Sequence, residues 1–384
     1  MNVLISLDGI SYRSFAGYMQ HRIENGYSCC KKLITTFPSV TFTAHVAAMT
    51  GSQLDRHGVF DNIVARPETM ERVALYGDHE ILCNEALHKQ TIFHSLARNA
   101  GTSCCVHWPM TSGNPYIHHL VTESSSKKKL KANVSVEEID RVALHETTQA
   151  IKAGIYDLIA TRFVGYDALS HQYGKDSPEA LHCLELLTTH LDHIEKTLKE
   201  MQKPFNLIIF SDHGQSDVQS FFYPNEILAK SQWKQHFRNK QIRFVGDGSG
   251  ALLFYSSLAH QQNKEIMAFF NQIPEVHRFY ELAGDKPSAC KPFGILDLKH
   301  MVCGEDIAFP EQPKYQEMKS LHGYHPANVD EMNGFLLCLG DAFTKSKVIE
   351  ETNIENIAPT LAQLFRIAHP CDGQPIKDIF KEYE

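Results

Sequence analysis

The sequence predicts an α/β fold in which a mainly parallel central sheet is covered by helices on both faces. Six short segments are mainly apolar and bounded by turn residues, as buried strands are. Segments of helical length lie between them, and apolar strands that alternate with helices are typical of parallel sheets buried on both sides. The expected strands are Val3–Leu7, Ser103–Trp108, Asp157–Phe163, Asn206–Ser211, Ala251–Tyr255 and Phe335–Leu339. The expected helices are Ala44–Thr50, Ile92–Asn99, Val136–Lys152, Pro178–Met201, Ala259–Asn271 and Ile354–Leu364.

Three stretches interrupt this alternation. Residues 63–87 are polar and irregular, and residues 110–134 contain Pro, Gly and Ser together with the lysine run Lys127–Lys131. We expect both to form a small cap over one edge of the sheet, inserted into a single domain that spans residues 1–384. The lysines are expected in a solvated loop, with contact to an anionic substrate as the alternative. A third irregular stretch, Gly284–Ser320, precedes the last strand.

Composition excludes several classes of protein. The 37 Lys and Arg residues are outnumbered by 45 Asp and Glu, so the basic footprint of a nucleic-acid-binding protein is missing. The apolar runs are far shorter than the ~18 residues of a membrane span, and the chain begins with a strand pattern in place of a signal peptide. Ten cysteines without C-x-x-C spacing fit reduced core thiols. We therefore expect a cytoplasmic protein with a small-molecule partner, whose oligomeric state stays open.

Acidic and histidine side chains follow three of the predicted strands. Asp8 follows the first strand, Asp167 and His171 follow the third, and Asp212 and His213 follow the fourth. Because ligands bind outside the carboxyl ends of strands in open α/β sheets, we expect these residues to meet at one edge. Asp and His are ligands that suit a divalent ion such as zinc. Each pair alone could be a surface pair or a polar turn, but their recurrence at three strand ends favours a metal site.

Two threonines lie where a helix of small residues is expected to begin. Thr41 and Thr43 follow Pro38 and Ser39, and Gly51 marks the end of that helix. The free N–H groups and positive dipole of a helix N-terminus bind phosphate groups well. A hydroxyl at this position can act as a nucleophile if a metal lowers its pKa. An ordinary helix cap is the alternative, and the residues alone do not choose between the two threonines.

The motifs around these residues resemble the nucleotide pyrophosphatase/phosphodiesterase branch of the alkaline phosphatase superfamily. The resemblance covers nearly the whole chain and implies an alkaline-phosphatase-like fold with metal-dependent phosphodiesterase or nucleotide pyrophosphatase activity. It rests on Asp8-Gly9, Pro38–His45, Met49–Gly51, Arg56–Asn62, Lys89–Ala97, Gly101, Trp108-Pro109, Asp167-x-x-x-His171, Ser211–Gly214, His322–Tyr324 and Ile357–Leu361.

The resemblance also implies a role for each matched residue. Thr41, and not Thr43, is the nucleophile that forms a phosphothreonine intermediate. The Asn62 amide, together with the Thr41 backbone N–H, binds a phosphate oxygen, and Phe42 occupies a position that can stack on a nucleobase. Two divalent ions, expected to be Zn²⁺, are held by Asp8, Thr41, Asp212 and His213 and by Asp167, His171 and His322. The motif selects His322 over His325, and we expect His45 and His57 to be structural.

The substrate class is the part that the resemblance leaves most open. A neutral amide at Asn62 suits a phosphodiester, whereas a monoester carries more charge and usually meets an arginine. A carbon–phosphorus hydrolase similar to phosphonoacetate hydrolase shares the threonine, asparagine and metal ligands, and Lys127–Lys131 would suit its substrate carboxylate. A phosphomonoesterase and an inactive phosphate-binding protein also remain candidates. We expect a small-molecule phosphodiester or nucleotide substrate.

Overall fold

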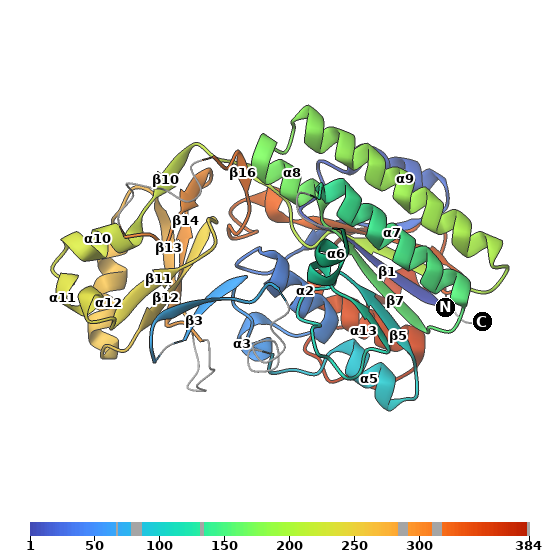
Figure 1. Cartoon of the computed structure of the whole chain (residues 1–384), viewed down its shortest axis with the longest axis horizontal. Helices are drawn as coiled ribbons and strands as arrows, with labels where there is room; N and C mark the ends of the chain where they lie inside the picture. Colours follow the sequence, from blue (N-terminus) through green and yellow to red (C-terminus); the bar gives the residue numbers. More distant parts are fainter. Residues whose placement is uncertain (67, 78–86, 131–133, 283–290, 309–316, 382–384) are drawn as a thin grey trace.

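The computed structural model describes residues 1–66, 68–77, 87–130, 134–282, 291–308 and 317–381. Its largest sheet has eight strands. Of these, β1, β5 and β7 are labelled at the right of Figure 1. The strand order of this sheet is β18-β2-β17-β8-β1-β7-β5-β6. Strand β17 runs against both of its neighbours; the other paired strands are parallel. The strands are β1 (Asn2–Leu7), β2 (Ser28–Ile34), β5 (Ser103–Val106), β6 (His119–Val121), β7 (Leu158–Phe163), β8 (Asn206–Phe210), β17 (Gly334–Gly340) and β18 (Val348–Asn353).

Helices cover both faces of this sheet, as the sequence predicts. Along β1, Leu4 packs into one apolar cluster while Val3 and Ile5 pack into another, because successive strand side chains point to opposite faces. No helix in the described ranges is both long and apolar enough to cross a membrane. The first face is covered by α2 (Thr41–Thr50), α5 (Ile92–Arg98) and α13 (Ile357–Phe365), and the second by α1 (Ala16–Glu24), α7 (Val136–Ala153) and α9 (Pro178–Glu200).

A second, smaller sheet lies beside the first, at the left of Figure 1. Its four strands are antiparallel in the order β11 (Ile242–Val245), β12 (Ala251–Ser256), β14 (Gly294–Leu298), β13 (Val276–Glu281). The helices α10 (Pro224–Lys230), α11 (Lys234–Arg238) and α12 (His260–Phe270) lie with it in Figure 1.

Placing Ala251–Tyr255 in the main parallel sheet is therefore wrong. This segment is β12, whose Leu252 and Phe254 pack into the core of the small sheet while Leu253 packs on the opposite side. An antiparallel strand covered on both faces is apolar throughout, so it cannot be distinguished from a parallel strand by its pattern alone. The Gly284–Ser320 stretch, expected to be irregular, contains β14 and β15 (Val302–Gly304); residues 284–290 and 309–316 lie outside the described ranges.

The two segments predicted as caps contain regular structure. Residues 63–87 include the hairpin of β3 (Ile63–Arg66) and β4 (Glu71–Ala74), and residues 110–134 include β6 and a helix, α6 (Glu123–Leu130). Residues 78–86 and 131–133 lie outside the described ranges, and the assignment of one domain with two caps stays a prediction.

The lysine run does not form a loop. Lys127, Lys128 and Lys129 occupy the last turn of α6, and Lys131 lies outside the described ranges. Glu123 in the first turn forms an i,i+4 ion pair with Lys127 at 2.5 Å, and the Thr122 hydroxyl accepts the Ser125 N–H at 3.0 Å. Acidic residues at the start of a helix and basic residues at its end complement the helix dipole, which explains why this polar segment is helical.

Candidate active site

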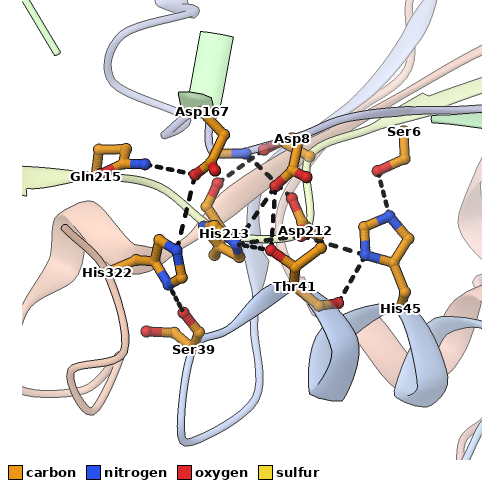
Figure 2. Close-up of polar contacts among 12 residues, drawn as sticks. Ser6, Asp8, Ser39, Thr41, His45, Asp167, Asp212, His213, Gln215 and His322 are labelled. Carbon is orange, nitrogen blue, oxygen red and sulfur yellow. Dashed lines mark hydrogen bonds and ion pairs between the residues drawn. The ribbon is translucent and has the colours of Figure 1, made fainter. Parts of the chain in front are cut away.

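The predicted metal ligands meet at the carboxyl ends of three adjacent strands, β8, β1 and β7 (Figure 2). Asp8 directly follows β1, Asp212 lies two residues beyond β8, and Asp167 lies in the first turn of α8 (Gly165–Tyr173), which follows β7. The backbone N–H of Gly9 donates to Asp212 Oδ1 at 3.2 Å, which ties the end of β1 to the end of β8. The sheet edge thus brings together carboxylates from distant parts of the chain.

Gly9 permits the close approach of Asp8 and Asp167. Its φ of +74° is a left-handed conformation that favours glycine. A Cβ atom at this position would lie 2.7 Å from Asp167 Oδ1 and 2.9 Å from Asp167 Cβ. Only glycine therefore allows the Asp167 carboxylate to stand where it does.

Replacing Gly9 by alanine is expected to displace Asp167 and to lower hydrolytic activity by about 10²-fold, the scale of a 1 Å misplacement in a reacting site. Steady-state kinetics on a diester substrate measures this loss. Gly17→Ala is the matched control, because Gly17 lies in α1 and its added Cβ would meet no atom within 4 Å. Equal activity of the Gly9 and Gly17 variants would show that the Asp167 position does not matter for the reaction.

The three histidines of the site are oriented by backbone carbonyl groups. The Nδ1 atoms of His171, His213 and His322 lie 2.8, 3.1 and 3.1 Å from the carbonyl oxygens of Ser320, Gly214 and Ser39. A carbonyl can only accept, so each Nδ1 carries the proton and each Nε2 keeps its lone pair. This is the arrangement by which proteins fix histidine as a metal ligand.

The free Nε2 atoms face carboxylates in two overlapping groups. Asp167 lies between His171 and His322, with 3.4 Å from Oδ2 to His171 Nε2 and 3.8 Å from Oδ1 to His322 Nε2. His213 Nε2 lies 3.5 Å from Asp8 Oδ1 and 3.3 Å from Asp212 Oδ2. Within each of the sets Asp167–His171–His322 and Asp8–Asp167–His213, one ligand atom per residue lies within 4.8 Å of the others.

This donor set fits divalent cations. Asp212 Oδ2 is fully buried and accepts no hydrogen bond from the described residues, a costly state for a carboxylate oxygen that a bound cation would relieve. Burial and the nearby Asp212 and Asp167 carboxylates raise the pKa of Asp8 well above its usual range. Burial and the neighbouring His213 lower the pKa of His322, which keeps its imidazole neutral and able to bind a metal. Carboxylate oxygens and neutral imidazoles are ligands that zinc takes in proteins.

The structure places Thr41, and not Thr43, beside these ligands. Thr41 is the first residue of α2, and its Oγ1 lies 3.1 Å from His213 Nε2 and 3.5 Å from Asp8 Oδ1. Thr43 is fully buried, and its hydroxyl has no hydrogen-bond partner among the described residues. The geometry therefore distinguishes two threonines that the residue pattern left equivalent.

His45 anchors the helix that carries Thr41. Its Nδ1 lies 2.8 Å from the Thr41 carbonyl and its Nε2 lies 2.9 Å from the Ser6 hydroxyl on β1 (Figure 2). The same Nδ1 is 3.3 Å from Asp212 Oδ2. His57 is also fully buried, and burial lowers its pKa to about 3, so it stays neutral. His45 therefore ties α2 to β1, and the structural role expected for both histidines stays a prediction.

A pocket of about 420 Å³ opens beside Thr41. Asn62 and Phe42 line it, and the Asn62 Oδ1 accepts the Phe42 backbone N–H at 3.0 Å, which holds the asparagine against the start of α2. Lys127 of α6 also lines the pocket. Its apolar lining includes Leu75, Tyr76, Trp108, Met110, Val136, Ile139 and Val164.

Sequence reasoning did not single out two polar residues of the site. Gln215 donates from Nε2 to Asp167 Oδ1 at 2.5 Å and accepts from the Ser320 hydroxyl at 3.0 Å, so it orients the Asp167 carboxylate (Figure 2). Arg162 lies 3.2 Å from Asp8 Oδ2 through its Nε. Arg162 had a visible signal, because an arginine inside an otherwise apolar strand requires a buried partner. The only sequence signal for Gln215 was its position directly after Asp212-His213-Gly214.

The fold and this edge of Asp, His and Thr residues have the arrangement that the sequence motifs led us to expect. The chain matches the family Type I phosphodiesterase / nucleotide pyrophosphatase over residues 2–306 and belongs to that family. The family prediction made from the motifs is thereby confirmed.

Individual proteins are similar to this chain in sequence or in fold. An uncharacterized pyrophosphatase/phosphodiesterase of Schizosaccharomyces pombe is 26% identical over 222 residues, which cover 55% of this chain but only 44% of the yeast protein. Human ectonucleotide pyrophosphatase / phosphodiesterase 5 has a similar structure, with a TM-score of 0.77, 20% identity and 99% coverage of both chains. An inactive form of the murine protein in complex with AMP gives a TM-score of 0.76 at 16% identity, again with 99% coverage of both chains. The alkaline-phosphatase-like fold is confirmed by these neighbours.

Proposed function

We propose that this enzyme is a two-metal phosphodiesterase or nucleotide pyrophosphatase that uses Thr41 as its nucleophile. The observation that carries the proposal is the position of Thr41 Oγ1, 3.1 Å from His213 Nε2 at the wall of the pocket. Family membership supports the hydrolysis of phosphodiester or phosphoanhydride bonds. The AMP complex of the murine neighbour supports a nucleotide as the substrate.

The residues divide into two sets that would each hold one divalent ion, most simply Zn²⁺. Asp8, Thr41, Asp212 and His213 would hold the first, and Asp167, His171 and His322 the second. Bound there, the ions supply Lewis-acid charge that stabilises the attacking and leaving oxygens of an in-line displacement.

The protein residues bind the phosphoryl group and transfer it, first to Thr41 and then to water. Thr41 Oγ1 loses its proton to solvent and forms a bond to phosphorus while the bond to the leaving oxygen breaks. Since Asn62 Oδ1 is occupied by the Phe42 N–H, the Asn62 NH₂ group is the part that can donate to a phosphate oxygen. Water then cleaves the ester on Thr41 and restores its hydroxyl. The aromatic side chains of Phe42 and Tyr76 offer surfaces for a nucleobase in a pocket of nucleotide size.

The cytoplasm is the compartment that we propose for this activity. All eight cysteines in the described ranges are free, and seven of them are buried. Burial raises the pKa of the Cys29 and Cys104 thiols to about 12, so these groups are unreactive. Unpaired, unreactive thiols support a reducing environment.

The substrate class is tested by comparing p-nitrophenyl-TMP with p-nitrophenyl phosphate. A neutral Asn62 amide stabilises the single charge of a diester better than the greater charge of a monoester. We expect kcat/KM for the diester to be higher by about 10²-fold or more, or ~2.7 kcal/mol of transition-state stabilisation. Asn62→Ala should lower diesterase activity by about 10–10³-fold, whereas Asn99→Ala, at an exposed helix end, should not.

Two different outcomes would replace the diesterase proposal. Equal or better turnover of p-nitrophenyl phosphate would make the enzyme a phosphomonoesterase. Release of acetate from phosphonoacetate, lost in Lys127→Ala, would make it a carbon–phosphorus hydrolase, a function that the position of Lys127 on the pocket wall supports.

A further inference from the structure

Arg162 is a charged residue in the interior of a central strand. It is the fifth residue of β7, between Thr161 and Phe163, and only 8% of its surface is exposed. The β1–β7 register places it opposite Ser6. Side chains of a strand alternate between faces, so Ser6 and Arg162 point to the face that α2 covers. Asp8, just beyond β1, lies 3.5 Å from Thr41 at the start of α2. A buried guanidinium on this face is costly unless its partners are fixed.

The two carboxylate oxygens of Asp8 have different partners, and Arg162 contacts one of them. Arg162 Nε lies 3.2 Å from Asp8 Oδ2. The other oxygen, Oδ1, lies 3.5 Å from both Thr41 Oγ1 and His213 Nε2. Asp8 is 2% exposed, so water does not compete strongly for either oxygen. The contact is an ion pair and not an aligned hydrogen bond, since Arg162 Nε has no hydrogen-bond partner among the described residues. The charge of Arg162 attracts Oδ2, while Oδ1 faces Thr41 and His213.

Glu123 balances the charge of Arg162. Arg162 Nη2 donates to Glu123 Oε2 at 3.0 Å, and Glu123 Oε1 also pairs with Lys127 at 2.5 Å. Glu123 is the first residue of α6, where the helix dipole favours a negative charge. A fixed positive charge beside two cations would weaken their binding, and Glu123, which contacts the Nη2 end of the guanidinium, offsets that charge.

We propose that Arg162 is a positioning residue that holds Asp8 Oδ2 so that Oδ1 becomes the metal ligand. Glu123 is the counter-charge that makes this guanidinium compatible with a cation site. The inference rests on the proposed function, since it assigns Asp8 as a metal ligand. It adds that Arg162, which is not itself a ligand, determines how tightly the metal binds.

The sign of the change in zinc affinity separates positioning from a simple charge effect. If Arg162 acted only as a charge, Arg162→Met would bind zinc more tightly and Arg162→Lys would equal the wild type. If it positions Asp8, both variants bind zinc more weakly, because a lysine ammonium cannot bridge Asp8 and Glu123 with the fixed fork of arginine. We expect losses of about 10–100-fold, the scale seen when the partner of a ligand is removed.

The experiment measures zinc affinity of the full chain by competition with a chromophoric chelator, after the native metal has been removed. The melting temperature of each zinc-free variant is recorded to separate lost folding from lost affinity. Glu123→Gln is a milder variant that keeps the Arg162–Asp8 contact. It should weaken zinc binding several-fold, because the buried guanidinium beside the site is then left without its counter-charge. Arg141→Met is the matched control, since Arg141 pairs with Glu137 on the surface of α7.

The experiment separates failure of the proposed function from failure of the role assigned to Arg162. A wild-type chain that binds no zinc overturns the proposed function itself. A wild type that binds zinc, with Arg162→Met and Arg162→Lys equal to it or tighter, overturns only the role of Arg162. If the Arg162 variants do not fold, Glu123→Gln with wild-type affinity overturns the inference by itself.

Discussion

Thr41→Val will abolish turnover, lowering kcat by about 10⁴-fold or more, the scale of losing a nucleophile. Valine keeps the shape of threonine and removes only the hydroxyl that lies 3.1 Å from His213 Nε2. Steady-state kinetics on p-nitrophenyl-TMP measures the loss. Thr41→Ser, which restores a hydroxyl at the same position, should recover a substantial part of the activity.

Thr43→Val is the matched control for this substitution. Thr43 lies two residues further along the same helix, and its buried hydroxyl has no partner among the described residues. Removing an unsatisfied buried hydroxyl costs little and can be stabilising, so we expect Thr43→Val to retain most of the activity and its melting temperature. Loss of activity in Thr43→Val with Thr41→Val still active would reverse the assignment of the nucleophile.

Removing one ligand of the second ion is expected to abolish activity as well. His322 is 6% exposed, and its Nε2 faces Asp167 Oδ1 at 3.8 Å. His322→Ala should bind one zinc equivalent in place of two, because three ligands fall to two and affinity at that position drops by about 100-fold or more. Elemental analysis of the purified chain measures the stoichiometry, and a chelator should inactivate the wild type reversibly.

His325→Ala is the control within the same loop. The His325 ring packs on Phe37 and Tyr280 and its Nδ1 accepts the Ala327 N–H at 3.2 Å, so its partners differ from those of the metal ligands. We expect this variant to bind two zinc ions. Full metal content in His322→Ala, or one equivalent in His325→Ala, would show that the second site is built from other residues.

The sequence predicted the sheet edge that carries the candidate site better than it predicted the small sheet and α6. Asp8, Asp167 and Asp212 could be placed together because parallel strands end at one edge of a sheet, a rule that depends on topology and not on detailed packing. The helix expected at Ala44–Thr50 is present but begins three residues earlier, at Thr41. Its end was foreseeable, because Gly51 follows it, and Gly51 adopts a left-handed conformation with φ of +63°.

The pattern of apolar residues in the sequence could not show which strands belong to the main sheet and which to the small one. The strand Ala251–Ser256 is apolar because both of its faces are covered, which is equally true of β1 and β7 in the main sheet. The helix at Lys127–Lys129 could in principle have been predicted, because Glu123 stands four residues before Lys127. The contact of Lys127 with the pocket could not have been predicted, since it depends on how α6 packs.

The residues that tune the ligands were the hardest to find. Gln215 acts through a hydrogen bond to Asp167, and the choice of that partner depends on tertiary structure alone. Arg162 could have been singled out by its charge within β7, but its partners, Asp8 after β1 and Glu123 on α6, lie far from it in the chain. Ligand types follow from local motifs, whereas the contacts that orient ligands follow from long-range packing.

The most direct test of the central claim is mass spectrometry of the enzyme quenched in acid during turnover of p-nitrophenyl-TMP. A nucleotidyl group linked to Thr41 should accumulate whenever cleavage of the ester by water is the slow step, and the adduct should be absent from Thr41→Val. An adduct on Thr43 or on a histidine, or a burst of p-nitrophenol with no covalent adduct, would contradict the account.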